Sequence, residues 1–76
     1  MKLTLYMRPL CPPCTYTKEY LKNQQIEFTE VDITENKKAI EILRYHGYQS
    51  VPVVSINDFE ESWSGYDLNK LKRLKS

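Results

Sequence analysis

The two cysteines of this 76-residue chain, Cys11 and Cys14, are the residues whose type and spacing most clearly predict chemistry. Thiols separated by two residues are close enough to form a reversible disulfide. Because that disulfide closes a very short loop, it removes little conformational entropy from the unfolded chain, and its reactivity matters more than its effect on stability. The pair therefore predicts thiol–disulfide exchange.

The position of the pair assigns a different role to each cysteine. Cys11 follows a predicted strand and precedes a predicted helix, where unpaired N–H groups and the positive end of the helix dipole favour a thiolate. Thiolates in such motifs have pKa values of about 3.5 to 7.5, against about 8.5 for a free cysteine. Cys14 lies one helical turn further on, towards the core, where burial shields it. We expect Cys11 to attack a substrate disulfide and Cys14 to resolve the mixed disulfide.

Pro12 and Pro13 separate the cysteines and limit this effect. Neither proline has an N–H to donate, and a residue before proline is biased away from helical geometry. We therefore expect the helix to begin at Pro13 and the pKa of Cys11 to be only moderately lowered. Arg8 is either a cation that assists the pair or an exposed surface residue.

A zinc site and an inert disulfide are the structural alternatives for the cysteine pair. A structural zinc site normally has four ligands. His46 is the only histidine, and a histidine just before a helix-ending glycine is more typical of the surface or of the helix C-terminus. The order of strand, cysteine pair and helix favours redox chemistry over both alternatives.

Strand and helix signals alternate through the first half of the chain, and these elements must position the cysteines. Apolar β-forming residues precede the pair, and apolar residues recur at helical spacing after it. A later helix begins at a cap, either Thr34 or Asn36, and ends at Gly47. The other expected elements are strands over residues 3–6 and 27–31 and a helix over residues 13–24.

The second half of the chain predicts a hairpin and a final helix. Two apolar-rich runs flank the turn residues Asn57 and Asp58, as in antiparallel strands. Asp67 is a suitable N-cap, and leucines recur every three residues after it. The expected strands cover residues 51–56 and 59–63, and the helical leucines are Leu68, Leu71 and Leu74.

The resulting element order, β-α-β-α-β-β-α, predicts a single α/β domain over residues 1–76. We expect a four-stranded mixed sheet with helices on both faces, in which the first two strands are parallel through a right-handed crossover. Such sheets place reactive groups at the carboxyl ends of their strands. Cys11 directly follows the first strand and so lies at that edge.

Composition excludes several classes of partner. The chain has 11 Lys plus Arg and 10 Asp plus Glu, a net charge of +1, which gives no general attraction to nucleic acid or to acidic lipid. No segment is apolar enough for a signal peptide or a membrane span. We therefore expect a cytoplasmic protein, and in a reducing cytoplasm a Cys-x-x-Cys pair is more often catalytic or metal-binding than structural.

Three motifs make the whole chain resemble the glutaredoxin and thioredoxin superfamily. Two are shared across the superfamily, whereas the third, an aromatic–Ser–Gly–aromatic motif before an aspartate, resembles the NrdH-redoxins, glutaredoxin-like electron donors to class Ib ribonucleotide reductase. The motifs are Cys11-Pro12-Pro13-Cys14, Ser50-Val51-Pro52, and Trp63-Ser64-Gly65-Tyr66 followed by Asp67. The resemblance implies the thioredoxin fold and a cis Val51–Pro52 peptide that faces the cysteines.

The resemblance also implies partners. NrdH-redoxins accept electrons from NADPH through thioredoxin reductase, whereas ordinary glutaredoxins hold glutathione at a Gly-Gly pair, where this chain has Ser64 and Gly65. We expect no bound cofactor or metal, a monomer, and a protein disulfide substrate, with ribonucleotide reductase the favoured one. The residues implied in partner binding are Arg8, Leu10, Pro12, Val51, Pro52, Trp63, Ser64, Gly65, Tyr66 and Asp67.

Two departures from the NrdH-redoxin pattern keep other functions open. The family usually has Arg-Pro between the aromatic residue and the aspartate, but Tyr66 runs directly into Asp67, and its active site seldom carries Pro-Pro. A glutathione-linked glutaredoxin of unknown target is one alternative. Another is an iron–sulfur or other metal-binding module in which Cys11 is a ligand. Trp63 also has a purely structural reading, as a core residue at a strand end.

Overall fold

The computed structural model describes residues 1–74 and contains the predicted order of strands and helices, with one added 3₁₀ turn. The strands are β1 (Leu3–Met7), β2 (Thr29–Asp32), β3 (Val53–Ile56) and β4 (Glu61–Ser64). The helices are α1 (Pro12–Asn23), α2 (Lys37–Tyr45) and α3 (Leu68–Leu71), and the turn η1 (Ile33–Glu35) precedes α2.

The four strands form one mixed sheet in the order β2-β1-β3-β4. β1 pairs in parallel with β2 through the α1 crossover, and it pairs antiparallel with β3. β3 and β4 form the expected antiparallel pair. The predicted architecture is therefore confirmed, with β1 and β3 at the centre of the sheet.

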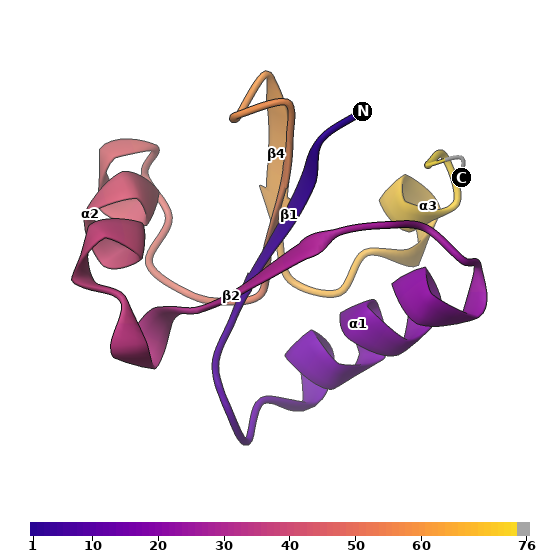
Figure 1. Ribbon diagram of the computed structural model, residues 1–76, viewed down its shortest axis with the longest axis horizontal. Helices are drawn as coiled ribbons and strands as arrows, with labels where there is room; N and C mark the ends of the chain where they lie inside the picture. Colours follow the sequence, from indigo (N-terminus) through magenta and orange to yellow (C-terminus); the bar gives the residue numbers. More distant parts are fainter. Residues whose placement is uncertain (75–76) are drawn as a thin grey trace.

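Helices cover both faces of this sheet, as expected (Figure 1). α1 and α3 lie on one face, over a cluster that includes Leu5, Leu21 and Leu71, each with 0% of its surface exposed. α2 lies on the other face, over a smaller cluster that includes Leu43 and Val53. Alternate residues of each strand pack into the two cores, because successive side chains of a strand point to opposite faces.

Local signals at the helix ends agree closely with the sequence. Asn36 caps α2, with its Oδ1 accepting the N–H of Ala39 at 3.0 Å, so of the two expected caps Asn36 is correct. Gly47 follows that helix with φ of +84°, a conformation that glycine adopts without a steric penalty. Asp67 caps α3, its Oδ1 accepting the N–H of Lys70 at 3.1 Å.

Several element boundaries differ from the expected ones by one or two residues, among them the start of β3, which is Val53 and not Val51. Two of the differences have a clear local reason. α1 begins at Pro12, one residue early, because the first helical positions need no intrahelical N–H and therefore tolerate both prolines. β2 begins at Thr29, two residues late. The preceding segment packs Ile26 into the core and bonds its N–H to the Leu21 carbonyl at 2.9 Å, so it follows α1 before it joins the sheet.

The hairpin loop is longer than predicted, and the expected two-residue turn is wrong. Asn57, Asp58 and Phe59 all have positive φ, of +50°, +56° and +68°, and β4 begins only at Glu61. The ring of Phe59 stacks on His46, with centroids 4.0 Å apart, so packing against the α2 side of the molecule removes this residue from the strand.

The helices described for residues 1–74 are all too short or too polar to cross a membrane.

Candidate active site

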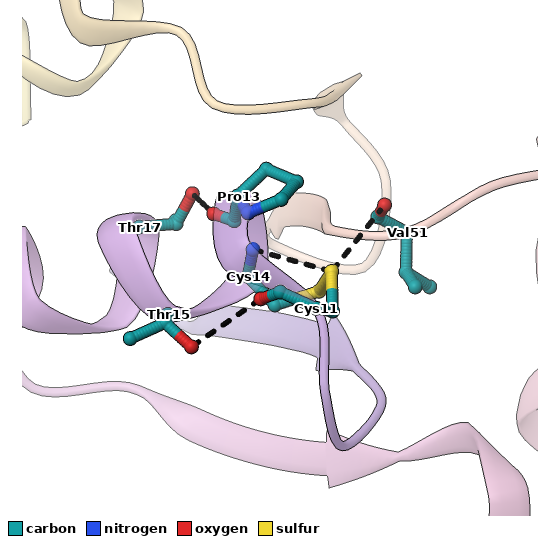
Figure 2. The surroundings of a disulfide bond; sticks show 6 residues. All are labelled: Cys11, Pro13, Cys14, Thr15, Thr17 and Val51. Atoms are coloured by element: carbon teal, nitrogen blue, oxygen red, sulfur yellow. Dashed lines mark hydrogen bonds between the residues drawn. A yellow bond between two sulfur atoms is a disulfide. The ribbon is translucent and has the colours of Figure 1, made fainter.

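Cys11 and Cys14 are joined as a disulfide at the end of β1 and the start of α1 (Figure 2). Their Cα atoms are 5.2 Å apart. Only 5% of the surface of Cys11 and 2% of that of Cys14 are exposed. The disulfide is therefore almost completely covered by the residues around it.

Cys11 is the N-cap of α1, and its sulfur takes the place of the usual capping oxygen. The N–H of Cys14 donates to the Cys11 Sγ at 3.3 Å, and the N–H of Thr15 donates to the Cys11 carbonyl at 3.0 Å. Because Pro12 and Pro13 have no N–H, the first amide of the helix that can reach the sulfur is that of Cys14. The helix thus directs one backbone donor at Cys11.

The segment before β3 covers the other side of the disulfide. The Cys11 Sγ lies 3.9 Å from the carbonyl oxygen of Val51, and Figure 2 shows the two atoms facing each other. In the disulfide this sulfur has no proton, so the contact becomes a hydrogen bond only when Cys11 is a thiol. The Val51–Pro52 peptide is cis, as the family resemblance implies, and the N–H of Gly65 donates to the Pro52 carbonyl at 2.8 Å.

The first turn of α1, which carries Cys14, is anchored by buried side chains. Cys14, Thr17 and Leu21 form the buried face of the helix. The hydroxyl of Thr17, fully buried, donates to the Pro13 carbonyl at 2.8 Å. That bond satisfies a buried polar group at the first turn, where an unpaired hydroxyl would be costly.

Four exposed apolar residues, which we call the apolar rim, flank Cys11 in the chain or lie on α1 and the segment that contacts it: Leu10, Pro12, Tyr16 and Tyr66. Leu10 is 100% exposed, Tyr16 56% and Tyr66 41%. The rings of Tyr16 and Tyr66 meet edge to face, with centroids 5.8 Å apart, and so link α1 to the segment after β4. Tyr16 was not among the predicted site residues, and its only signal in the sequence is an aromatic residue on the polar face of a helix.

Two predicted partner-binding residues, Trp63 and Asp67, make structural contacts within the chain. Trp63 is buried in the core cluster, with the Lys70 Nζ 5.9 Å from its ring centroid. Its indole Nε1 has no hydrogen-bond partner among the described residues. The carboxylate of Asp67 is engaged as the α3 cap, while Ser64 is exposed on β4.

A cationic cavity of about 290 Å³ lies beside Cys14. Arg8, Lys18 and Lys22 line it together with Leu10, and Glu19 is its one acidic lining residue. Lys18 pairs with Glu30 at 2.9 Å, whereas Arg8 is exposed. Arg8 and Cys14 thus line the same cavity.

A second cavity of about 540 Å³ adjoins Val51 on the α2 side. This cavity was not predicted from the sequence, because its walls come from η1, α2 and the following loop and meet only in the folded chain. Its lining residues are Ile33, Ile40, Leu43, Arg44, Gly47, Tyr48, Gln49, Ser50 and Val51.

Within residues 1–74, no group of three or more His, Cys, Asp or Glu side chains is placed to hold a metal ion.

Comparison with known proteins gives a consistent set of relatives. Residues 3–59 match the family model for glutaredoxin. The glutaredoxin-like protein NrdH of Escherichia coli strain K12 is 34% identical over 74 residues, covering 97% of this chain and 89% of that protein.

Two solved structures are similar over almost the whole chain. The glutaredoxin-like protein NrdH-redoxin from Escherichia coli, described as having a thioredoxin-like activity profile, has a TM-score of 0.92 and 32% identity, covering 100% of this chain and 97% of that one. A glutaredoxin from Archaeoglobus fulgidus has a TM-score of 0.80 and 35% identity, with 96% and 84% covered.

Proposed function

This chain belongs to the glutaredoxin family and has the thioredoxin fold and the redox-active cysteine pair of a thiol–disulfide oxidoreductase, and from that premise we propose that it is an NrdH-redoxin-like electron carrier. In this role Cys11 is the attacking thiol and Cys14 the resolving thiol. The reducing equivalents come from NADPH through thioredoxin reductase, and the recipient is a protein disulfide, with ribonucleotide reductase the favoured one.

The proposed reaction is two consecutive thiol–disulfide exchanges. The Cys11 thiolate attacks one sulfur of the substrate disulfide, forms a bond with it and releases the other substrate sulfur as a thiolate. The Cys14 thiolate then attacks the Cys11 Sγ and releases the second substrate thiolate. The substrate gains two electrons and takes up two protons, and the protein is left with the Cys11–Cys14 disulfide, which thioredoxin reductase reduces again.

The hydrogen bond from the Cys14 N–H to the Cys11 Sγ is the main support for these roles. An N–H donor directed at a sulfur stabilises its thiolate, and at the start of a helix the dipole adds to that effect. Cys14 lies inside the first turn, on the buried face of α1. From there it can approach the Cys11 sulfur but not a protein substrate.

The cysteine roles predict that only one single-cysteine variant traps substrate. Cys14→Ser should accumulate a mixed disulfide on Cys11, because attack proceeds and resolution does not. Cys11→Ser should trap no substrate and reduce no disulfide. Mass spectrometry after incubation with insulin measures the adducts, and circular dichroism confirms that both variants are folded. Adducts on Cys14 alone would reverse the assignment.

The apolar rim supports a protein as the source of electrons. Glutathione is a small anionic peptide, and binding it requires cationic and backbone partners held around the disulfide. Here the cations Arg8, Lys18 and Lys22 line a cavity on the Cys14 side. The exposed residues of the apolar rim are surface of the kind that is enriched at protein interfaces. The similarity to an NrdH-redoxin with a thioredoxin-like activity profile points the same way.

A side-by-side kinetic assay tests the electron source. The oxidised protein is reduced either by NADPH with thioredoxin reductase or by glutathione with NADPH and glutathione reductase, and insulin or a disulfide peptide of ribonucleotide reductase is the acceptor. We expect faster turnover with thioredoxin reductase. Turnover with glutathione alone would make the protein a glutathione-linked glutaredoxin.

We also assign it to the cytoplasm, since a reducing compartment supports a catalytic Cys-x-x-Cys pair.

A further inference from the structure

Leu10 combines two properties that the fold does not explain. Its side chain is 100% exposed, and its backbone has a φ of +56°. In the left-handed region the Cβ of an L residue crowds the following carbonyl, so the conformation suits glycine or asparagine and costs leucine free energy. Leu10 also lies outside both core clusters. Neither packing nor backbone preference therefore accounts for a leucine here.

The other non-glycine residues with positive φ between residues 1 and 74 each have a local explanation. Asn57 and Asp58 are of the types that tolerate this region, and they form the hairpin loop. Phe59 is fixed by the stacking of its ring on His46. Gln25 directly follows the C-cap of α1 and exposes a polar side chain. Leu10 alone combines an unfavourable backbone conformation with a large apolar side chain directed into solvent.

Leu10 is the neighbour of the attacking cysteine in the chain. It directly precedes Cys11, so its left-handed turn leads the chain from the loop after β1 into the N-cap of α1. Asparagine or glycine would make the same turn with less strain. Strained backbone conformations cluster at functional sites, and an exposed leucine beside the reacting sulfur is suited to a contact with a partner.

The charges beside Leu10 indicate the chemistry of that partner. The cavity that Leu10 borders is lined by Arg8, Lys18 and Lys22 and by one acid, Glu19. Lys18 is paired with Glu30, so Arg8 and Lys22 supply the remaining positive charge. A protein surface with carboxylates around an apolar pocket would complement both features. A small dithiol has neither a pocket nor an array of carboxylates.

We propose that Leu10 is a docking anchor, which inserts into an apolar pocket bordered by acidic residues on the protein that reduces the Cys11–Cys14 disulfide. This rests on the proposed function, in which that protein is thioredoxin reductase. Leu10 does not take part in the sulfur chemistry. It positions the disulfide against the partner's cysteines, so its contribution is confined to reactions with a protein.

The test compares one protein reductant with one small reductant. Leu10→Asn removes the apolar side chain with a residue that tolerates the left-handed backbone, and Leu10→Gly removes it while relieving the strain. Tyr45→Asn is the matched control, because Tyr45 is 84% exposed and lies on α2, across the sheet from α1 (Figure 1). Each oxidised variant is reduced by thioredoxin reductase with NADPH and, separately, by dithiothreitol.

We expect both Leu10 variants to lose about tenfold or more in kcat/KM with thioredoxin reductase, mainly through KM, because an apolar anchor is removed from a desolvated pocket. Their rates with dithiothreitol should stay within about twofold of wild type. Tyr45→Asn should resemble wild type with both reductants. Arg8→Gln should lower kcat/KM with the reductase and weaken its dependence on salt.

Three results would overturn the proposal, and they are distinguishable. If Leu10→Asn keeps kcat/KM with the reductase within about twofold of wild type, Leu10 is not an anchor. If the rate with dithiothreitol falls as far as the rate with the reductase, Leu10 acts on the disulfide itself. If the wild type is not reduced by thioredoxin reductase, the proposed electron source is wrong, and the anchor assigned to it is wrong as well.

Discussion

The surroundings of Tyr6, on the central strand β1, shift the pKa of its phenol. Burial raises its pKa above the ordinary value of 10.0, and the negative charge of Asp58 raises it further, while Lys2 opposes the shift. The ring packs beside Phe59, with centroids 5.7 Å apart. A phenolate at this position would have to form in a partly desolvated site beside a carboxylate, so the folded protein holds the phenolic proton more tightly than the unfolded chain does.

Stability should therefore fall in alkaline solution, and part of that fall should belong to Tyr6. Below the unfolded pKa of about 10, both states keep the proton and the contribution is fully present. As the pH rises from there through the higher folded pKa, the unfolded chain loses the proton first and unfolding becomes easier. Urea denaturation at pH 8 to 11 measures the effect, and Tyr6→Phe should show a shallower decline. An equally steep decline in the variant would show that Tyr6 does not contribute.

The reactive residues were largely predictable from the sequence, but their surroundings were not. Cys11 and Cys14 are identified by spacing, and the Val51–Pro52 peptide by its motif. The left-handed conformation of Leu10 is not one that its residue type predicts, and the contact between Tyr16 and Tyr66 arises only when α1 and the segment after β4 meet. Such contacts join residues far apart in the chain, and local patterns do not encode them.

At the scale of elements, two glycines end their segments with almost the same geometry. Gly47 follows α2 with φ of +84°, and Gly65 follows β4 with φ of +85°. A Cβ atom added at either position would meet no atom within 4 Å beyond the two neighbouring residues of the chain. The cost of a side chain at these positions is therefore conformational and not steric.

Gly47→Ala and Gly65→Ala should each lower the free energy of unfolding by about 1 kcal/mol, because alanine disfavours the left-handed region. Asparagine at the same positions should cost less, since it tolerates that region better. Chemical denaturation of the four variants measures this order. Equal stability for the alanine and asparagine variants would show that backbone conformation does not determine the cost.

Elements with strong local signals were predicted best, and the errors occur where tertiary packing overrides them. The caps Asn36 and Asp67 bond as their residue types predict. The hairpin turn was wrong because Phe59 packs on His46 instead of continuing the strand. The start of β2 was displaced because Ile26 is drawn into the core beneath α1. In each case a long-range apolar contact outweighs a local preference.

At the scale of the whole molecule, α3 connects the end of the chain to the larger core. It is only four residues long, so its stability depends on packing and not on helix propensity. Leu71 inserts into the cluster beneath α1 with 0% of its surface exposed, whereas Leu68, three residues earlier in the same helix, is 38% exposed.

These two leucines form a matched pair for a stability measurement. Leu71→Ala should lower the free energy of unfolding by about 2 to 5 kcal/mol, because it removes a fully buried side chain and leaves a cavity. Leu68→Ala should cost less than about 1 kcal/mol. Urea denaturation of both variants gives the comparison. Similar losses would mean that α3 does not anchor to the core through Leu71.

The apolar rim is separate from the residues that hold the disulfide, and this separation bears on how the protein can evolve. Leu10, Pro12, Tyr16 and Tyr66 are exposed, whereas Cys14 and Thr17 beneath them are buried. Substitutions in the rim therefore change the exposed surface at little cost to folding, while the buried residues that hold the cysteine pair stay constant. Under the proposed role of the rim, a lineage can exchange one redox partner for another by small steps there, while each intermediate keeps the fold and the cysteine pair.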